Sequence, residues 1–321
     1  MRRGLIIGKF MPIHEGHIAM IRFASQHCDE LIVSMSYTEE DPIPGALRFN
    51  WITEIFQDDN IIRPELVVDD FDNESLSWTE RTKVWADFLF KRYGKVEVII
   101  SSEAYGHLLA MHLNAIHISF DADRKRVPVR ASLIRAKPLE NWDFIPKVVR
   151  PYFVKKVCFY GPESTGKSVM ASYFAEAYQT EFVPEVAREM VNSNTFTSDD
   201  FIKIGYAQTE RVLLKSKTAN KVLFCDTDHI TTQIYSRHYL GEVPPLLYEL
   251  EKQITYDQYF LFDIDVPWVT DGLRDLGDRR EEMAAIFKSE LERRAIPYVL
   301  VSGTWEERFK RIKTEIDGYM G

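Results

Sequence analysis

The stretch GLIIGKFMPIHEGHIAMIRFASQHC, Gly4–Cys28, decides how the first half of this chain folds. Its apolar run GLIIG predicts a β-strand, and the amphipathic HIAMIRFASQHC predicts a helix. Between them, the ten residues Gly8–His17 hold a lysine, two histidines, two glycines and a proline. A buried core segment has no use for the histidines, and an ordinary loop does not need them three residues apart. The stretch therefore predicts a strand–turn–helix unit whose turn carries functional side chains.

Strand-like and helix-like patterns alternate through the rest of the first half. Strand-like runs occur at 30–37, 65–71, 95–102 and 115–121, and amphipathic helical segments at 48–57, 77–94 and 103–113. This alternation predicts βαβ units in a parallel, doubly wound sheet. Residues 137–153 contain three prolines and interrupt the pattern, which indicates a connection between two domains.

The same alternation restarts in the second half. A strand, a glycine-rich turn and a helix are predicted over 155–178, followed by strand-like runs at 181–185, 221–228, 258–264 and 297–303. A length of 321 residues also favours two domains over one. We therefore expect an α/β fold of two domains, residues 1–148 and 149–321, each built on a parallel sheet.

Composition excludes several classes of protein. A net charge of -9 argues against a general nucleic-acid or membrane surface, because such surfaces need clustered lysine and arginine. The cysteines Cys28, Cys158 and Cys225 lie far apart, which favours a reducing compartment over a disulfide framework. No apolar run is long enough to cross a bilayer. We expect a cytoplasmic protein without membrane insertion or nucleic-acid partner.

The glycine-rich turn of the second half fits the phosphate-binding pattern G-x-x-x-x-G-K-[ST]. Its backbone N–H groups are expected to surround the phosphates of ATP, with the lysine at the β- and γ-phosphates and the final serine on Mg²⁺. The alternative is a βα turn that binds nothing, but a strand precedes the motif and a helix begins at its lysine, as a phosphate-binding loop requires. The motif comprises Gly161, Pro162, Glu163, Ser164, Thr165, Gly166, Lys167 and Ser168.

Several charged residues of the second half are candidates for a kinase reaction. Asp226 and Asp228 end an apolar strand, where an acid holds Mg²⁺ or orients the attacking hydroxyl; alternatively, Asp228 only caps the next helix. Glu185 and Arg188 either contact a substrate or are solvated first-turn charges. An Arg- and Asp-rich segment provides a lid or a plain loop, with the candidates Arg274, Arg279 and Arg280. A single phosphate-binding loop without an arginine-rich face favours a small-molecule kinase.

The histidines of the opening stretch predict an anion site. His14 and His17 start a helix three residues apart and so share a face, Lys9 approaches from the preceding strand, and Gly16 leaves the helix N-terminus open to a phosphate. Zinc is the competing interpretation. A zinc ion would lack further protein ligands here, because the nearest acid, Glu15, points off the face that the two histidines share.

The stretch resembles the G-x-F-x-P-x-H-x-G-H motif of the nucleotidylyltransferase superfamily, in which it matches Gly8, Phe10, Pro12, His14, Gly16 and His17. A second superfamily motif, I-S-x-T-x-I-R, resembles VRASLIR and aligns with Ser132 and Arg135. Arg130 stands where the superfamily usually has a small serine. The resemblance implies a Rossmann-like nucleotidylyltransferase fold for the first domain.

Taken with VPEVARE, DTDHITTQ and DGLR of the second half, the whole chain resembles the NadR family. Its members are bifunctional nicotinamide-mononucleotide (NMN) adenylyltransferases and ribosylnicotinamide kinases, which implies a P-loop kinase fold for the second domain. Some members carry an N-terminal helix-turn-helix repressor domain. Because this sequence starts at the first strand of the transferase domain, we expect no autonomous DNA-binding repression.

The resemblance implies that nicotinamide riboside is phosphorylated to NMN and that NMN and ATP then give NAD and pyrophosphate, with Mg²⁺ as cofactor. A catalytic role is implied for Lys9, His14, His17, Arg135, Lys167, Asp226, Asp228 and Arg274. The first domain is expected to bind ATP through Gly8, Phe10, His14, His17, Ser101, Ser102, Ser132 and Arg135. Substrates are expected to contact Trp78, Trp85, Glu185 and Arg188, and the metal to be held by Ser168 and Asp226.

Two other functions compete with this interpretation. One is a kinase–adenylyltransferase that makes another dinucleotide from a flavin or pantetheine precursor. The other is an ATP- or NAD-sensing module without turnover, which would have no need of His14, His17, Lys167 and Ser168 together. The sequence leaves open a homo-oligomer and functional coupling to a riboside transporter.

Overall fold

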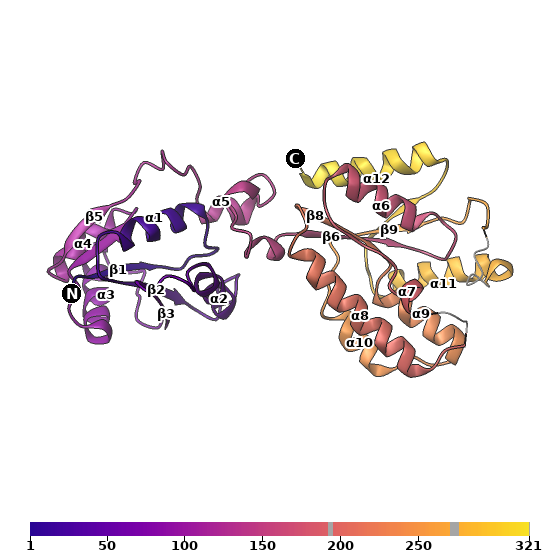
Figure 1. The fold of residues 1–321 in the computed structure, drawn as a ribbon, viewed down its shortest axis with the longest axis horizontal. Helices are drawn as coiled ribbons and strands as arrows, with labels where there is room; N and C mark the ends of the chain where they lie inside the picture. Colours follow the sequence, from indigo (N-terminus) through magenta and orange to yellow (C-terminus); the bar gives the residue numbers. More distant parts are fainter. Residues whose placement is uncertain (192–194, 270–275, 321) are drawn as a thin grey trace. The chain divides into compact units, whose positions relative to one another are not determined.

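The computed structural model describes residues 1–191, 195–269 and 276–320. The chain forms two compact units, Met1–Arg150 and Pro151–Gly321. Each unit contains one five-stranded sheet, and every strand pairing within the two sheets is parallel (Figure 1). The α/β fold with two parallel sheets is therefore confirmed.

The first sheet has the strand order β3-β2-β1-β4-β5. Its strands are β1 (Arg3–Gly8), β2 (Glu30–Tyr37), β3 (Ile62–Val68), β4 (Val98–Ser101) and β5 (Ile116–Ser119). The helices of this unit are α1 (Glu15–Ser25), α2 (Gly45–Ile55), α3 (Trp78–Tyr93), α4 (Tyr105–His112) and α5 (Ala131–Ala136). The chain order reverses between β1 and β4, and the carboxyl ends of strands at such a point form a crevice in doubly wound sheets.

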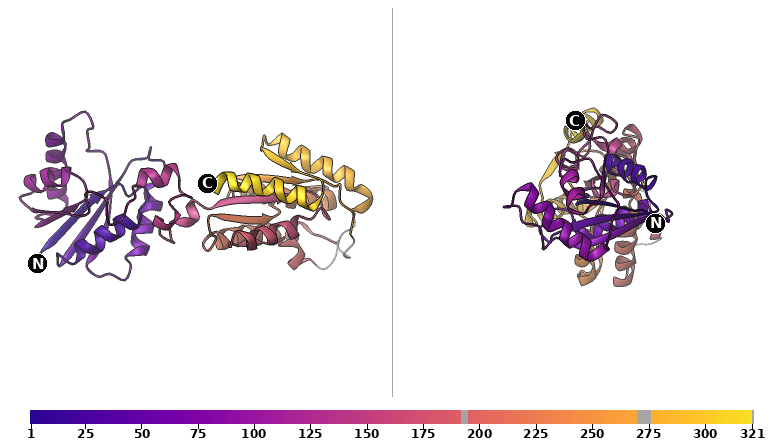
Figure 2. Two further views of the ribbon diagram at one scale, coloured as in Figure 1. Left: turned by 90° about the horizontal axis from the view of Figure 1, so that it is seen from above. Right: turned by 90° about the vertical axis from the view of Figure 1, so that its left-hand side faces the viewer.

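The sheet of the first unit is covered on both faces. Leu5, Ile32 and Ile99 of three adjacent strands pack against Leu89 of α3 and Leu109 of α4. Helix α1 lies on the opposite face and buries its own apolar side (Figures 1 and 2). Two apolar faces explain why the central strands are almost continuously hydrophobic.

Two sequence expectations about this unit need correction. Strand β3 spans Ile62–Val68 and includes Pro64, whereas the sequence pattern predicted a strand over 65–71. Because β3 is an edge strand, the missing N–H of Pro64 interrupts no central ladder. The proline-rich connection also packs against the first unit as far as Arg150, with Trp142 and Ile145 buried.

The second sheet has the order β10-β9-β6-β8-β7. Its strands are β6 (Lys155–Tyr160), β7 (Phe182–Val183), β8 (Val222–Asp226), β9 (Gln258–Phe262) and β10 (Tyr298–Val301). The helices are α6 (Lys167–Ala177), α7 (Ala187–Met190), α8 (Ser198–Ser216), α9 (His229–Leu240), α10 (Pro245–Glu251), α11 (Arg280–Arg293) and α12 (Trp305–Met320). Short 3₁₀ turns occur at Trp142–Phe144, Arg150–Tyr152 and Gly277–Arg279.

Alternate side chains of β6 separate two cores in this unit. Phe159 packs against Phe174 of α6 and Ile312 of α12, whereas Tyr160 on the opposite face packs against Ile234 of α9 and Phe287 of α11. The turn after β6 is thereby held rigidly at the carboxyl edge of the sheet. Within the part of the chain described, no helix combines the length and hydropathy that a membrane span requires.

Candidate active sites

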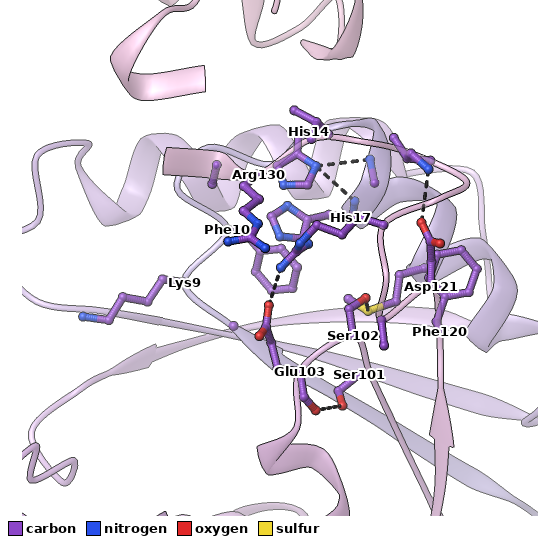
Figure 3. Close-up of a pocket in the computed structure, with 18 of the residues that line it drawn as sticks. Lys9, Phe10, His14, His17, Ser101, Ser102, Glu103, Phe120, Asp121 and Arg130 are labelled. Atoms are coloured by element: carbon purple, nitrogen blue, oxygen red, sulfur yellow. Dashed lines mark hydrogen bonds and ion pairs between the residues drawn. The ribbon is translucent and has the colours of Figure 1, made fainter. Parts of the chain in front are cut away.

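The first site is a cavity of about 480 Å³ at the carboxyl ends of β1 and β4 (Figure 3). It is lined by the turn after β1, the first turn of α1, the loop after β4 and the segment 120–132. These segments are far apart in sequence, and the reversal of strand order brings them together. The cavity therefore unites the two motifs that resemble those of nucleotidylyltransferases.

His14 and His17 form a stacked pair in this cavity. Their ring centroids are 3.7 Å apart with an interplanar angle of 24°. His14 caps α1: its Nδ1 accepts the backbone N–H groups of Gly16 at 3.1 Å and His17 at 3.4 Å. Since Nδ1 is an acceptor, a neutral His14 carries its proton on Nε2 and is a donor there.

Electrostatics keep both rings neutral. Burial, and then the positive charge of Arg124, lower the pKa of His14 to about 4. Burial, and then the neighbouring His14 and Arg124, lower the pKa of His17 well below its ordinary value. The described residues contain no group of three His, Cys, Asp or Glu side chains that could hold a metal. The pair is consequently built to donate hydrogen bonds without adding positive charge.

Gly16 has a structural role in addition to the one predicted. A Cβ at Gly16 would lie 3.0 Å from Cε1 and 3.1 Å from Nδ1 of His14, closer than side-chain contacts normally allow. Glycine is therefore needed so that the His14 ring can fold back over the helix N-terminus, and not only to leave that N-terminus open. Phe10, which is buried, supports the pair with its ring edge-on to His17 at 5.0 Å. Gly8 lies beneath the Phe10 ring.

Lys9 does not converge with the histidines. Its Nζ lies 3.6 Å from Asp41 Oδ1, and the side chain points away from His14 and His17 (Figure 3). Asp41 is held in place by the fully buried Arg48, which donates to it at 2.6 Å. The expected cluster of one lysine and two histidines is wrong for this conformation, because Asp41, far away in sequence, attracts the ammonium group.

The loop after β5 brings a cation that the sequence motifs did not predict. Arg124 forms an ion pair with Glu103 at 2.5 Å beside the histidines. Asp121 organises the loop, because its carboxylate accepts three backbone N–H groups, those of Lys125, Arg126 and Val127. The signal in the sequence was the run DADRKR immediately before the second motif.

The remaining predicted residues of this domain divide into two groups. Ser101, Ser102 and Ser132 line the cavity. The Ser101 hydroxyl is already engaged, since it donates to Glu103 O at 3.0 Å and lies 3.0 Å from a ring nitrogen of His117. Arg135 does not line the cavity, because its guanidinium donates to the carbonyl of Met11 in the first motif. The two motifs are therefore connected through a backbone carbonyl.

A neighbouring cavity of about 180 Å³ shares the turn after β1 with the first. Trp85 lines it, and its Nε1 donates to Asp72 at 2.9 Å. Arg81 also pairs with Asp72 and lies over the ring of Trp85. Trp78, in contrast, is 54% exposed, stacks on Tyr105 and does not line the cavity. Of the two predicted aromatic residues, only Trp85 faces a cavity.

The second site is the turn between β6 and α6. Gly161 (φ 135°) and Gly166 (φ 90°) adopt left-handed backbone angles that favour glycine, and a Cβ at Gly161 would come within 2.9 Å of Phe262 O. Lys167 is buried, and its Nζ donates to Pro162 O at 2.7 Å. Burial lowers the pKa of the Lys167 ammonium. This loop has the curled backbone that a phosphate-binding loop requires.

Asp226 ends β8 next to this loop. Its Oδ1 is buried and has no hydrogen-bond partner in the described part of the chain, and its carboxylate accepts a hydrogen bond from Ser168. Burial, and then the negative charge of Glu185, raise the pKa of Asp226 to about 6. An orphaned carboxylate oxygen beside a serine hydroxyl is a donor set that suits Mg²⁺.

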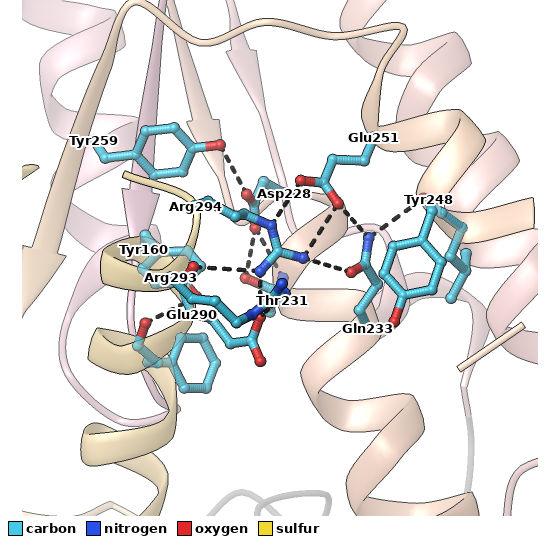
Figure 4. Close-up of polar contacts among 12 residues, drawn as sticks. Tyr160, Asp228, Thr231, Gln233, Tyr248, Glu251, Tyr259, Glu290, Arg293 and Arg294 are labelled. Atoms are coloured by element: carbon cyan, nitrogen blue, oxygen red, sulfur yellow. Dashed lines mark hydrogen bonds and ion pairs between the residues drawn. The ribbon is translucent and has the colours of Figure 1, made fainter. Parts of the chain in front are cut away.

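Asp228 has a structural role, as the capping alternative predicted. Its Oδ1 accepts the backbone N–H of Thr231 at 2.9 Å and so caps α9, and its Oδ2 accepts the hydroxyl of Tyr259 at 2.9 Å (Figure 4). The side chain is buried and does not line a substrate cavity. The catalytic role predicted for Asp228 therefore does not fit its position, because both oxygens are occupied within the protein.

Figure 4 also shows an ionic network beside Asp228. Arg294 donates to Glu251 of α10 at 2.8 Å and to Gln233 of α9 at 2.7 Å, and pairs with Glu290 of α11. Three helices are thereby joined around one guanidinium. Helix α9 also lines a second cavity, beside the phosphate loop, so this network fixes one wall of that cavity.

Glu185 and Arg188 meet at this second cavity, of about 90 Å³. Arg188 Nε donates to Glu185 at 2.7 Å, and the phosphate-loop residue Glu163 lies at the same cavity. The wall also includes aliphatic and hydroxyl side chains and four aromatic ones, Phe196, Phe201, Tyr235 and Tyr239. An apolar pocket with a few charged groups is typical of a small-molecule site next to a nucleotide.

The predicted lid arginines have different positions. Arg274 lies outside the described residues. Arg279 is exposed and pairs with Glu282, whereas Arg280 donates to Ser164 O in the phosphate loop at 3.1 Å and to Val266 O at 2.6 Å. Within the part of the segment that the structure describes, Arg280 is the cation adjacent to the loop.

Comparison with known proteins agrees with this arrangement. A family model described as cytidylyltransferase-like matches residues 5–137, and one described as an AAA domain matches residues 156–308. The chain is 29% identical to the trifunctional NAD biosynthesis/regulator protein NadR of Escherichia coli (strain K12), over 99% of this chain and 83% of that protein. The chain is NadR-like. The family resemblance expected from the motifs is therefore confirmed.

Other relatives extend this result. The NadR-like chain is 23% identical to the nicotinamide-nucleotide adenylyltransferase of Pyrococcus furiosus, over 47% of this chain and 82% of that protein. A crystal structure of NadR in complex with NR superposes with a TM-score of 0.83 at 21% identity, covering 100% of this chain and 96% of that one. Another, of NadR with NAD and AMP-PNP, gives the same score at 22% identity. These structures show that the fold is shared along the whole chain.

Proposed function

We propose that this NadR-like chain is a bifunctional enzyme that phosphorylates nicotinamide riboside to NMN and then transfers the adenylyl group of ATP to NMN, giving NAD and pyrophosphate. The observation that carries the proposal is the presence of two separate nucleotide sites, each with an adjoining cavity, in one chain that aligns with NadR over 99% of its length. Each adjoining cavity shares lining residues with its nucleotide motif, Glu163 in the second unit and Gly8 and Lys9 in the first.

The kinase step takes place at the second unit. The 5′-hydroxyl of the riboside attacks the γ-phosphorus of ATP, and the ribose is oriented by Glu185 in the cavity beside the phosphate loop. Lys167 leaves the carbonyl of Pro162 to bind the phosphates, and Arg280 lies close enough to the loop to stabilise the spreading charge. Arg274 stays a predicted second cation. Asp228 contributes by holding α9 in position.

Mg²⁺ fits this site, with Ser168 and Asp226 as its protein ligands. The fit rests on the buried, unpartnered Oδ1 of Asp226 and its hydrogen bond from Ser168. The ion supplies charge neutralisation at the β- and γ-phosphates.

The adenylyl transfer takes place at the first unit. NMN lies in the cavity lined by Trp85, and its phosphate oxygen attacks the α-phosphorus of ATP in the adjoining cavity. The attacking phosphate is already anionic, so no general base is needed, and the site contributes orientation and charge stabilisation. His14 donates its Nε2–H to a phosphate oxygen, and Lys9 exchanges Asp41 for the phosphates.

One assay tests the whole proposal: the purified chain is given nicotinamide riboside, ATP and Mg²⁺, and NMN and NAD are followed by chromatography. Formation of both products is expected, and the absence of both would overturn the proposal. Lys167→Ala should block riboside phosphorylation and leave NAD formation from added NMN intact. His17→Ala should instead let NMN accumulate. Equal loss of both steps in each variant would contradict separate sites.

A further inference from the structure

The ATP cavity of the first unit has few cations available to a triphosphate. Arg124 pairs with Glu103, and Lys9 pairs with Asp41, which it has to leave before it can reach a phosphate. His14 is buried and His17 half-buried, the two rings stack against each other, and their surroundings keep them neutral. Arg135 donates to a backbone carbonyl outside the cavity lining. A bound triphosphate, which carries about four negative charges near neutral pH, needs a further positive group.

Arg130 meets this need. Of the lysine and arginine side chains that line the cavity, Arg130 alone has no hydrogen bond or ion pair to its charged group within the described ranges. Its backbone is fixed, because its carbonyl accepts the N–H groups of Leu133 at 3.0 Å and Ile134 at 3.2 Å, and Val129 beside it is buried. The base of the side chain is therefore anchored while the charged end is exposed and free to bind.

The position of Arg130 indicates which part of ATP it would meet. Figure 3 shows the side chain beside the rings of Phe10 and His17, on the opposite side of the cavity from Ser101. This is the side where the imidazoles donate hydrogen bonds and phosphates are expected. The sequence adds a second reason, because the superfamily motif usually has a small serine here, which supplies one hydroxyl and no charge.

We propose that Arg130 binds the β- and γ-phosphates of ATP and stabilises pyrophosphate as it leaves, an inference that rests on the adenylyl transfer proposed above. In that step an oxygen of the NMN phosphate forms a bond to the α-phosphorus. The bond from the α-phosphorus to the bridging oxygen breaks, and its electron pair stays on the pyrophosphate. Arg130 remains protonated throughout and donates hydrogen bonds to the charge that develops on the leaving group.

The test compares the full-length wild type with Arg130→Ser, which restores the usual superfamily residue, and with Arg130→Lys. Arg126→Ser is the matched control, because Arg126 belongs to the same loop and carries the same charge but does not line the ATP cavity. Calorimetry with pyrophosphate and, separately, with AMP gives the two dissociation constants. Steady-state kinetics give kcat and KM for ATP and for NMN.

Arg130→Ser should weaken pyrophosphate binding and raise the KM for ATP by about tenfold or more, as expected for the loss of charged hydrogen bonds. AMP binding and the KM for NMN should change by less than about twofold, and Arg130→Lys should recover part of the loss because it restores charge without the planar fork. Arg126→Ser should resemble the wild type.

Three results would overturn this assignment. The first is pyrophosphate binding by Arg130→Ser within about twofold of the wild type. The second is an equal loss of AMP binding, which would place Arg130 at the adenosine. The third is a wild type that does not bind pyrophosphate. If the wild type binds pyrophosphate but makes no NAD from NMN and ATP, the proposed function fails, and the binding series still decides the role of Arg130.

Discussion

Replacing Gly16 by alanine should separate the catalytic geometry of the first unit from its stability. The new Cβ would lie 3.0 Å from Cε1 and 3.1 Å from Nδ1 of His14, so the ring must move by a few tenths of an ångström. His14 is 3% exposed and stacks on His17 at 3.7 Å, which leaves it little room to retreat. The substitution therefore displaces a site residue without removing any functional group.

The expected effect on stability is small because two contributions oppose each other. Alanine in place of glycine within a helix stabilises by about 0.5–1 kcal/mol. A histidine forced away from its preferred rotamer costs about 0.5–1.5 kcal/mol. The net change is about 1 kcal/mol or less, which shifts the melting temperature of a unit of this size by roughly 2–4 °C.

The expected effect on activity is much larger. A displacement of about 1 Å in a positioned group lowers a rate by about a hundredfold, so a shift of a few tenths of an ångström should lower kcat/KM by roughly tenfold. NAD formation from NMN and ATP is the assay, and riboside phosphorylation by the second unit of the same protein is the internal reference.

Gly318→Ala is the matched control, because a Cβ at Gly318 in α12 meets nothing within 4 Å. It should leave NAD formation unchanged. A Gly16→Ala protein with NAD-forming kcat/KM within about twofold of the wild type would refute the reasoning about His14. A decrease of several kcal/mol in the free energy of unfolding would refute the expected balance between the gain from alanine in the helix and the cost of moving the His14 ring.

Three further predictions concern other groups. Burial and the charge of Arg124 lower the pKa of His14 to about 4. In NMR, the ring signals of His14 should therefore titrate at a pH far below the ordinary pKa of histidine. A titration midpoint near 6.5 would contradict a buried, neutral His14. Burial would raise the pKa of Glu290, but hydrogen bonds from Arg293 and Arg294 outweigh it and lower the pKa to about 2. This carboxylate therefore stabilises the fold above pH 4.5 and loses its contribution as the pH falls toward 2. In chemical denaturation, Glu290→Gln should have a lower free energy of unfolding than the wild type at pH 7, and that free energy should fall less on acidification. The same dependence of stability on acid pH in variant and wild type would argue against the network. Trp85→Ala should raise the KM for NMN by several-fold, because an aromatic ring attracts the cationic nicotinamide. Trp78→Ala, at an exposed residue, is the comparison, with NMN formation unaffected in both variants. An equal rise in the KM for NMN in Trp78→Ala would show that the contact is wrongly assigned to Trp85.

Much of the fold was predictable because its signals are local. A parallel α/β sheet needs apolar strands, amphipathic helices and glycine turns, and these patterns are written within short windows of the chain. The phosphate loop is such a case: its glycines, Lys167 and Ser168 are neighbours in sequence, and one strand–turn–helix unit places all of them. The stacking of His14 on His17 likewise follows from their spacing at a helix start.

The misplaced residues share a different feature, which is a partner distant in sequence. Lys9 was expected among the histidines, but Asp41 attracts it. Asp228 has the sequence context of a catalytic acid, yet the hydroxyl of Tyr259 and the helix it caps occupy its oxygens. No local pattern contains the contacts with Asp41 and Tyr259, because they depend on which segments the fold brings together, whereas the cap of α9 is local and was the alternative that the sequence offered.

The amino-acid sequence alone therefore determined the class of fold, the order of the two domains and the chemistry of each phosphate-binding turn. Tertiary structure decided which charged side chains in the sites are free to bind a ligand. A side chain that is neutralised by a remote partner, such as Arg124 by Glu103, looks identical in sequence to one that faces the cavity with no ion pair to any described residue, such as Arg130. Availability depends on distance and burial, because the interaction of two charges weakens with their separation and with exposure to water, and only the folded chain sets both.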